Sequence, residues 1–380
     1  MDNLRLVIVN KIKDIPRQQW YDIFPAEIIE GYDYFKTLDE SNLPLFSLHY
    51  CLVYQEDRIA CIAPFFITDF SLDTTMQGCF KKIVSSIQKV LPKFLRIKML
   101  FFGSPLTEEG IMGFSKDCDI KQALSFLIQE ILQLCKDKKI GVITFYNLTT
   151  RDMHIIEFLK TNGFGCMEAF PLARVEIKEH SLEKYIQNLG PSTRKNIRRK
   201  LKKAYAQAEI KIEERNNLNG LLNQAYQLYL NTYNSGGVSF EKLTPEYFSK
   251  ISEHMPEATK YFIVWINNQM AAFNLCLVKG SFCIDKYFGL DYEVAYKYNL
   301  YYVTWCYNID WCIKHGVRYY QPGTCDYDPK IRMGGRLIPL YVCTRFLNSL
   351  VNCLTAPLLK LIQPKNFDPV LRNLQKYEKK

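Results

Sequence analysis

The stretch "YFIVWINNQMAAFNLCLVKGSFCIDKYFGLD", from Tyr261 to Asp291, predicts three consecutive antiparallel strands. Its apolar and aromatic runs are separated by the pairs Asn267-Asn268 and Lys279-Gly280, which favour tight hairpin turns. We expect a long helix over about residues 295–315 to follow, and then a short strand at "RYYQPG". Three paired strands followed by a helix and another strand indicate a mixed sheet covered by helices.

The first half of the chain repeats the form of this hairpin. Residues 52–60, "LVYQEDRIA", and residues 263–271, "IVWINNQMA", share the order apolar, Val, aromatic, two residues, Asp or Asn, polar, apolar, Ala. The offset between them is too large for a solenoid repeat and suits a duplicated domain. We therefore predict an α/β (α+β) protein with two domains, residues 1–176 and residues 177–380. A helix is expected near residues 78–90.

One short segment holds most of the excess positive charge. Seven of the ten residues from Arg194 to Lys203 are basic and none is acidic, in a chain whose net charge is +10. The spacing predicts a helix over residues 192–208, with Arg194, Arg198 and Lys202 on one stripe. A solvated charged face is one interpretation. Because like charges at i and i+4 repel, an anionic ligand such as phosphate is the other. Base-specific reading of DNA is not expected, because the helix lies outside any DNA-binding motif.

These parts, taken together, resemble the GNAT acyltransferases, and most closely the FemABX-type aminoacyltransferases and the BioF2-like or CelD-type acetyltransferases. The segment "STRKNIRRKLKKA" resembles that group's "S-x-[KR]-x-[KR]-x-x-[LI]-R-[KR]" helix. The run "YFGLDYEVAYKYNLYYVTWCYNIDWCIKHGVRYYQPGTCDYDPKIRMGG" resembles its aromatic strand, Tyr-opened helix and G-x-x-x-Y-x-x-K-x-x-x-G motif, which here is Gly323, Tyr327, Lys330 and Gly334. The resemblance covers residues 175–345 well and the first half by architecture. It implies tandem GNAT-like domains, each with a mixed, largely antiparallel twisted sheet flanked by helices.

The resemblance also implies a function, namely transfer of an acyl group from acyl-CoA to an amine acceptor, in cell-envelope or polysaccharide biosynthesis. The acceptor would be a small molecule, a glycan or a peptide. Ordinary GNAT enzymes hold the CoA pyrophosphate on a glycine-rich turn, but this chain has no glycine between Gly289 and Gly316. FemABX-type domains depart similarly and take aminoacyl-tRNA as donor, so a tRNA-dependent transferase stays an alternative. A catalytically degenerate binding module is a further one.

Three residues are candidates for catalysis: Asp285, Tyr287 and Lys330. Strand alternation places Asp285 and Tyr287 on one face, where Asp285 either accepts the proton of the acceptor amine or forms a cross-strand salt bridge. Lys330 lies in a glycine-containing loop and is expected to neutralise an anionic group or an oxyanion, unless that loop is an ordinary surface turn. The candidate residues for substrate or donor binding are Arg194, Arg198, Tyr298, Asn299, Gly323, Tyr327 and Gly334.

Other residue patterns exclude several classes of site. The thirteen cysteines contain no CxxC pair and the five histidines have no metal-ligand spacing, so we expect no metal. Most cysteines are expected to be buried thiols in a reducing cytosol, which gives a cytoplasmic protein. The run Phe346 to Leu359, "FLNSLVNCLTAPLL", is too short and too polar to span a bilayer and predicts a buried or interfacial helix. With the basic helix, it leaves peripheral contact with the inner face of the membrane as another alternative.

Overall fold

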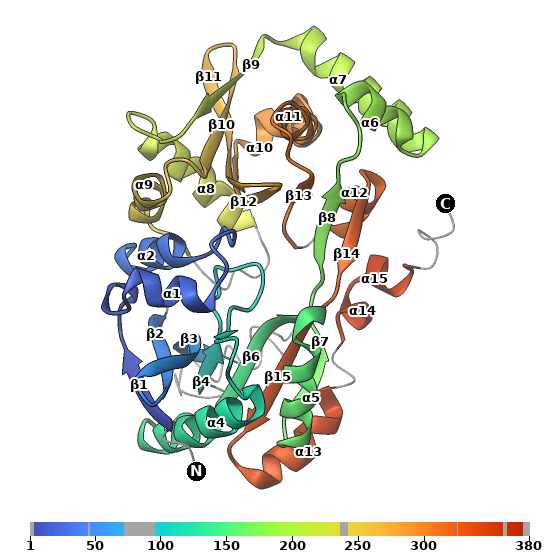
Figure 1. The fold of residues 1–380 in the computed structure, drawn as a ribbon. Coiled ribbons are helices and arrows are strands. Elements are labelled where there is room, and N and C mark those ends of the chain that lie inside the picture. The colour runs from blue at the N-terminus through green and yellow to red at the C-terminus, as the bar shows by residue number, and fades with distance from the viewer. Residues whose placement is uncertain are drawn as a thin grey trace, which may run out of the picture. The chain divides into compact units, whose positions relative to one another are not determined.

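The computed structural model describes residues 4–44, 46–71, 96–235, 242–324, 326–359 and 363–374. The helix expected near residues 78–90 lies outside these ranges. The chain forms two compact units whose sequences interleave (Figure 1). The first unit takes Met1–Pro25, Leu43–Ala169 and Leu340–Gln363, and the second takes Ala26–Asn42, Phe170–Pro339 and Pro364–Lys380.

The sheet of the first unit has the strand order β1-β2-β3-β4-β6-β15-β7, with β5 beside β3. Only the pair β4 and β6 is parallel, and the other pairs are antiparallel. The strands are β1 (Leu4–Val9), β2 (Ser47–Gln55), β3 (Arg58–Ser71), β4 (Arg96–Phe102), β5 (Gly113–Phe114), β6 (Val142–Thr149), β7 (Gly165–Glu168) and β15 (Leu340–Phe346). The helices are η1 (Ile12–Asp14), α1 (Arg17–Ile23), α4 (Ile120–Asp137), η3 (Thr150–Asp152), α5 (Met153–Thr161) and α13 (Ser349–Leu359).

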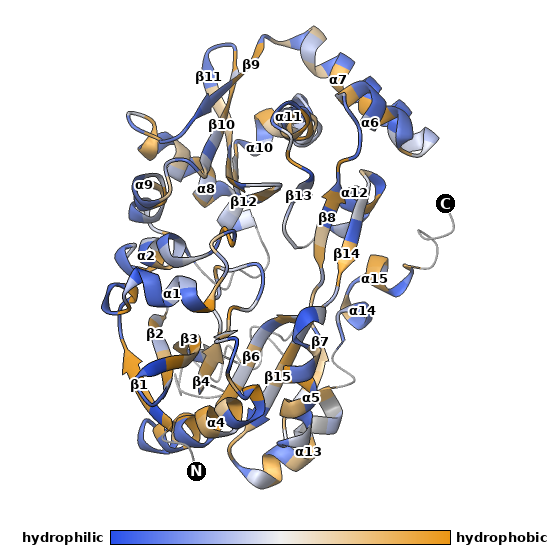
Figure 2. Cartoon of the chain, in the orientation of Figure 1, coloured by the Kyte–Doolittle hydropathy of each residue, from blue (hydrophilic) through white to orange (hydrophobic). Residues whose placement is uncertain are grey.

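Helix α4 shows why this unit folds as it does. The side chain of Asp119 accepts a hydrogen bond from the Gln122 N–H and so caps the helix. The buried residues of the helix recur every three or four positions, which gives one apolar stripe: Ala123, Leu124, Leu127, Ile128, Ile131 and Cys135. Figure 2 shows this hydrophobic stripe beside the polar remainder of the helix. The stripe packs into the core that the strands of the sheet build.

The second unit repeats the same succession of pairings. Its order is β14-β8-β13-β12-β11-β10-β9, with β12 and β13 parallel and the other pairs antiparallel. The strands are β8 (Leu172–Glu176), β9 (Ile210–Arg215), β10 (Thr259–Ile266), β11 (Gln269–Lys279), β12 (Phe282–Leu290), β13 (Tyr319–Gln321) and β14 (Gly335–Ile338). The helices are α2 (Tyr32–Glu40), α6 (Leu182–Asn188), α7 (Pro191–Gln207), α8 (Leu222–Ser235), α9 (Pro245–His254), α10 (Tyr292–Lys297), α11 (Leu300–Lys314), α12 (Tyr327–Arg332), α14 (Pro364–Phe367) and α15 (Pro369–Arg372).

The β2–β3 hairpin and the β10–β11 hairpin, whose sequences share one pattern, also correspond in their structural details. The β2–β3 ladder shifts register between Val53 and Tyr54, and the β10–β11 ladder shifts between Val264 and Trp265. The turn residue Glu56 has a φ of 54°, and Asn267, at the same offset along the chain, has a φ of 48°. The prediction of two mixed, largely antiparallel sheets with helices is confirmed, down to the irregularity before each turn.

The units differ from the expected halves of the sequence because each sheet takes strands from both. Strand β8, which ends at Glu176, pairs with β13 and β14 of the second sheet. Strand β15 returns to the first sheet, where it pairs with β6 and β7. Segment Ala26–Asn42 joins the second unit, where Glu30 forms a buried ion pair of 2.7 Å with Lys286. No single boundary at residue 176 separates the two units, because each sheet contains a strand from the other half of the chain.

The cysteines depart from the expectation in one pair. Cys166 of β7 and Cys343 of β15 are directly opposite in the ladder, with Cα atoms 4.1 Å apart, and form a disulfide. Nine other cysteines of the described ranges are free thiols, and seven of these are buried, as expected. Burial raises the pKa of Cys276 to about 12. Within the described ranges, the structure has no helix both long and apolar enough to cross a bilayer.

Candidate active site

A β-bulge in β12 determines which side chains reach the site. Cys276 of β11 lies opposite Asp285, and the preceding residue, Leu275, lies opposite Tyr287. Lys286 is therefore the extra residue of this bulge. An extra residue reverses the alternation of the side chains that follow it. Asp285 and Tyr287 consequently project from opposite faces of the sheet.

The contacts of the two side chains establish these faces. Tyr287 lies against the aromatic rings of α8 and α9, with centroid distances of 5.6 to 6.4 Å to Tyr229, Tyr247 and Phe248. Asp285 lies on the face that α11 covers, where Asn308 donates to it over 3.5 Å. The prediction that Asp285 and Tyr287 share a face is therefore wrong, because strand alternation alone does not include the bulge.

Asp285 accepts hydrogen bonds from buried donors on three other elements. The Tyr320 hydroxyl of β13 donates to its Oδ2 at 2.6 Å, and the Asn274 Nδ2 of β11 donates to its Oδ1. Asn308 of α11 also donates to Tyr320 Oη at 3.1 Å. Burial, together with the charge of Asp285, raises the pKa of Tyr320 well above its ordinary value, so this hydroxyl stays a donor. The four side chains form a fixed carboxylate centre, the Asp285 cluster.

The Asp285 cluster lies where two parallel strands part. The pairing of β12 with β13 ends at Ile284 and Gln321, and Asp285 is the next residue of β12. The Cβ of an alanine at position 323 would lie 4.0 Å from the Asp285 carbonyl oxygen, so the loop after β13 passes beside this point. The carboxyl ends of neighbouring parallel strands are a common place for a ligand site.

The loop motif is held together by hydrogen bonds from its side chains to backbone carbonyl oxygens. The buried Lys330 Nζ donates to the carbonyl oxygens of Thr324 at 2.9 Å and Gly323 at 3.3 Å. The buried Tyr327 hydroxyl donates to the Pro171 carbonyl oxygen at 3.0 Å, which ties the loop to the segment before β8. The structure thus brings the predicted loop residues together, with Lys330 and Tyr327 bonded to backbone.

Gly323 and Gly334 adopt the backbone conformations with positive φ that this loop requires. Their φ angles are 71° and 90°, in the region that only glycine adopts without strain. Gly334 lies beside α6, where an added Cβ would come within 3.5 Å of Leu189 and 3.9 Å of Tyr185. Both glycines therefore define the path of the chain around α12.

Tyr298 and Asn299 form the junction between α10 and α11. Tyr298 is buried in an apolar cluster with residues of β10 and β11. Asn299 adopts the left-handed conformation, with a φ of 52°, and its carbonyl oxygen accepts the Tyr302 N–H at 3.0 Å. An asparagine thus supplies the positive φ that begins α11, at the place where the resemblance led us to look for glycine.

The basic helix α7 presents two different stripes. Arg194 donates to the Gln187 carbonyl oxygen at 2.8 Å, and Arg198 pairs with Glu183, so the stripe named from the sequence faces α6. The neighbouring stripe, with Lys195 and Arg199, lines a cleft of about 400 Å³. The prediction from the sequence named only the stripe of Arg194, Arg198 and Lys202. The polar neighbours of the cleft-lining stripe, Ser192 and Asn196 at the same helical spacing, were the available signal.

The opposite wall of the cleft comes from α11 and α12. Its lining residues there are Tyr302, Asp328, Pro329, Arg332 and Met333. Asn196 donates to Tyr302 Oη at 3.3 Å, and Lys200 Nζ lies 3.8 Å above the Tyr302 ring. Arg332 Nε lies 2.9 Å from the Asp328 carboxylate. With Lys195 and Arg199, the cleft holds three cations and one carboxylate, a balance that favours an anionic ligand.

The comparisons with known proteins agree with this architecture. Residues 11–335 match the FemAB-like family, described as peptidoglycan biosynthesis and recognition. The chain belongs to this family. No match was found among proteins with curated functions.

Solved structures place the FemAB-like chain among tandem GNAT folds. A tandem GNAT protein from the clavulanic acid biosynthesis pathway is 11% identical, with a TM-score of 0.55, over 91% of this chain and 99% of that one. FemX is 12% identical, with a TM-score of 0.52, over 82% and 90%. L-PGS from Bacillus licheniformis is 11% identical, with a TM-score of 0.50, over 83% and 89%. The predicted family and the predicted fold are both confirmed.

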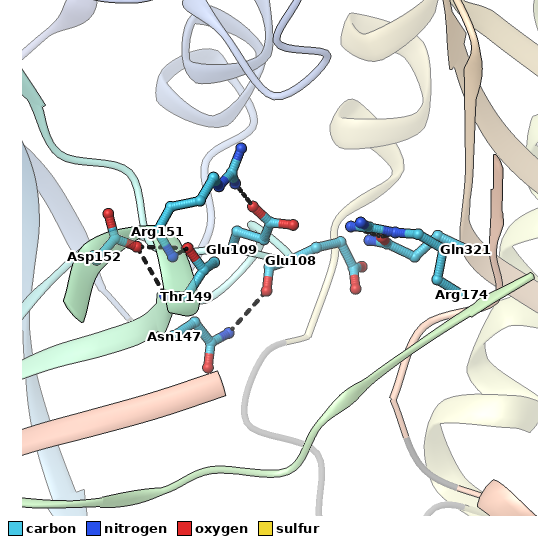
Figure 3. A network of polar contacts seen from close by, with 8 residues as sticks. All are labelled: Glu108, Glu109, Asn147, Thr149, Arg151, Asp152, Arg174 and Gln321. Carbon is cyan, nitrogen blue, oxygen red and sulfur yellow. Dashed lines mark hydrogen bonds and ion pairs between the residues drawn. The ribbon is translucent and has the colours of Figure 1, made fainter. Parts of the chain in front are cut away.

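The corresponding place in the first unit of the FemAB-like chain is closed by backbone. The Gly110 N–H donates to the Asn147 carbonyl oxygen at 2.7 Å. Asn147 Nδ2 donates to the Glu108 carbonyl oxygen at 3.2 Å (Figure 3). The Thr149 N–H donates to Asp152 at 2.8 Å and begins η3. These contacts seal the end of β6, because the loop before β5 lies directly on that strand.

The end of β13 in the second unit carries a polar pair instead. Arg174 of β8 donates from Nε at 3.2 Å and from Nη2 at 2.9 Å to the Gln321 Oε1 (Figure 3). The guanidinium also lies 5.3 Å from the centre of the Phe282 ring. Arg174 thus holds the last residue of β13 in place, immediately beside the point where Asp285 leaves the ladder.

One further cluster has the residue types of a metal site but contains an ammonium group. Atoms of Glu40, Glu253 and His254 that could bind a metal lie within 4.8 Å of one another. Lys250 Nζ lies 2.8 Å from Glu253 and 3.6 Å from Glu40, and His254 Nε2 lies 2.8 Å from Glu40. The cluster is therefore an ion-pair network between α2 and α9.

Proposed function

We propose that the second unit transfers an acyl group from acyl-CoA to an amine acceptor. The observation that carries this proposal is the Asp285 cluster, a carboxylate fixed by buried donors where β12 and β13 part. The FemAB-like family and the tandem GNAT fold support acyl transfer as the reaction class. The description of the family favours a peptide or glycan amine of the cell envelope as acceptor.

The chemistry assigns a role to the carboxylate. As the amine nitrogen attacks the acyl carbonyl, a C–N bond forms, the C–S bond of the thioester breaks, and the nitrogen loses a proton. Asp285 accepts this proton, directly or through a water, and the thiolate leaves and is protonated in turn. Tyr320 and Asn274 hold the carboxylate in one orientation, which saves reorganisation in the transition state. Tyr287 and Lys330 act here as positioning residues. Tyr287 holds β12 against α8 and α9, and Lys330 holds the loop after β13.

The donor's phosphate groups are assigned to the cleft of α7, α11 and α12. Lys195, Arg199 and Arg332 supply its positive charge. Phosphate is bound bidentately by arginine and as a point charge by lysine, so this set suits the polyanionic part of CoA. Arg194 and Arg198 hold α7 against α6, and so fix the cleft without lining it.

A second candidate changes only the donor, to aminoacyl-tRNA. The observation that favours it is the junction of α10 and α11, which is built by Tyr298 and Asn299 without a glycine-rich turn. The leaving group would then be the ribose hydroxyl of the tRNA instead of a thiolate. The phosphates of RNA would give strongly salt-dependent binding at the cleft.

The test is a transfer assay with a choice of donors. The purified chain is incubated with acetyl-CoA, longer acyl-CoAs or bulk aminoacylated tRNA, and with amine acceptors that include peptidoglycan precursors. Mass spectrometry then detects the acylated product, and Asp285→Asn serves as the inactive control. Product from acyl-CoA supports the first donor, and product from charged tRNA alone supports the second. If ligands bind equally to both variants without any product, a binding module replaces the enzyme.

A further inference from the structure

Tyr301, in the first turn of α11, has a buried hydroxyl that makes no hydrogen bond to any residue the structure describes. Buried hydroxyl groups are nearly always hydrogen-bonded, because an unpaired one gives up its bonds to water and receives nothing in return. The same helix follows this rule at Thr304, whose hydroxyl donates to the Leu300 carbonyl oxygen at 2.9 Å. The Tyr301 hydroxyl is therefore a donor that a ligand can use.

The position of Tyr301 on α11 places its side chain on the stripe that faces the Asp285 cluster. Tyr301, Trp305 and Asn308 follow one another at i, i+4 and i+7, so they lie on one side of the helix. Asn308 is a member of the cluster, and the Trp305 ring lies 5.3 Å from the ring of Tyr320, another member. The Tyr301 ring in turn lies 6.0 Å from the Trp305 ring. This stripe joins Tyr301 to the place where β12 and β13 part.

Two carboxylates act on the Tyr301 hydroxyl. Burial raises the pKa of Tyr301 above its ordinary value, and the negative charges of Asp285 and Asp326 raise it further. Asp326 immediately precedes α12, in the loop after β13. A phenol in this setting keeps its proton near neutral pH and is a poor acid toward a thiolate, because the ordinary pKa of a thiol is only about 8.5. The hydroxyl is therefore suited to donate a hydrogen bond and not to transfer its proton.

We propose that the Tyr301 hydroxyl donates a hydrogen bond to the carbonyl oxygen of the acyl donor during transfer, an inference that rests on the proposed function. When the amine nitrogen attacks, the C–N bond forms and the carbonyl oxygen gains the electron pair of the C=O π bond, while Asp285 takes the amine proton. A negative charge that develops beside the carboxylates of Asp285 and Asp326 needs a hydrogen-bond donor. Tyr301 supplies that donor and keeps its proton, and the C=O bond re-forms as the leaving group departs.

The test compares Tyr301→Phe with the wild type in the full chain, using the donor that gives product in the transfer assay. Turnover should fall by about 10²–10³, the usual effect of removing one donor to an oxyanion, while the KM of the donor changes by less than about twofold. The matched control is Tyr307→Phe, because Tyr307 is on the same helix but lies against Phe262 of β10, with ring centroids 5.2 Å apart. This control should keep the turnover of the wild type.

Chemical denaturation of the same variants separates this role from a structural one and needs no substrate. Tyr301→Phe should unfold at the same denaturant concentration as the wild type or at a higher one, because the substitution removes a buried hydroxyl without breaking a hydrogen bond inside the protein. A lower midpoint, or unchanged turnover of Tyr301→Phe, overturns the inference and leaves the proposed function intact. Absence of product from the wild type with every donor overturns both.

Discussion

The two units have sheets with the same succession of pairings, but they differ in the residues found where their parallel strands part. In the first unit, β4 and β6 end their pairing at Phe102 and Phe145, whose rings stack with centroids 4.5 Å apart. In the second unit, the corresponding strands end beside Asp285, which accepts hydrogen bonds from Tyr320 and Asn274. One place is filled with apolar rings and the other with a fixed carboxylate. The same strand order therefore holds an apolar filling in one unit and a fixed polar centre in the other.

The largest expected effect comes from removing an aromatic ring from the apolar place in the first unit. Phe145→Ala should lower the free energy of unfolding by about 3–5 kcal/mol, because it leaves a cavity under the sheet. Chemical denaturation measures this change. The rate of acyl transfer per folded molecule should stay within about twofold of the wild type, and a large fall in that rate would place part of the chemistry in the first unit.

The substitution Asp285→Asn removes the carboxylate from the corresponding place in the second unit. We expect the turnover rate to fall by about 10²–10³, because the amide cannot accept the proton of the amine, while the Kd of the donor changes little. Steady-state kinetics and donor titration measure the two quantities. Asp310→Asn is the matched control, since Asp310 is an ion-paired aspartate of α11 in the same unit. Equal activity of the two variants would contradict the proposed base.

The two stripes of α7 sharpen the comparison within one helix. Lys195→Ala with Arg199→Ala should raise the KM of the donor by about tenfold or more, because two cations leave the cleft. Arg194→Ala with Arg198→Ala removes the same charge from the stripe that faces α6, and should change KM far less. The salt dependence of KM should weaken only in the first pair. Similar effects of both pairs would mean that only the net charge of the helix matters.

The smallest expected effect comes from Tyr320→Phe. Loss of one hydrogen bond to the carboxylate should lower turnover by roughly tenfold. The variant should also change alkaline stability. Because burial raises the folded-state pKa of Tyr320 above its unfolded value, the wild type keeps this contribution below pH about 10 and loses it as the pH rises further. Unfolding measured from pH 8 to 11 should show a shallower fall for the variant, and parallel curves would contradict this.

The hairpins were predictable because their information is local. The turn pairs, the alternating apolar residues and the offset between the two copies all lie within nine-residue stretches. The same patterns led to the tandem fold and the family. The loop motif was also predictable as a group, since Gly323, Tyr327, Lys330 and Gly334 are brought together by one short helix.

The remaining features depend on distant parts of the chain. The bulge at Lys286 follows from the register between β11 and β12, and Lys286 is fixed there by Glu30, from the start of the chain. The position of α6 decides which stripe of α7 faces α6 and which lines the cleft. The charge pattern of α7 alone does not contain this position. Likewise, Asn274 and Asn308 read as ordinary polar residues of a strand and a helix until β13 brings Tyr320 between them.

The exchange of strands has a consequence for how the protein is made. The disulfide partners Cys166 and Cys343 are separated by 177 residues, and β15 fills a place in a sheet whose other strands end at Glu168. A ribosome therefore completes the second sheet before it releases the strand that finishes the first. The first sheet must wait with an unfilled gap between β6 and β7 during synthesis, and unpaired strand edges attract wrong partners. Slow closure of this gap, late in translation, is the step at which chaperones would be needed most.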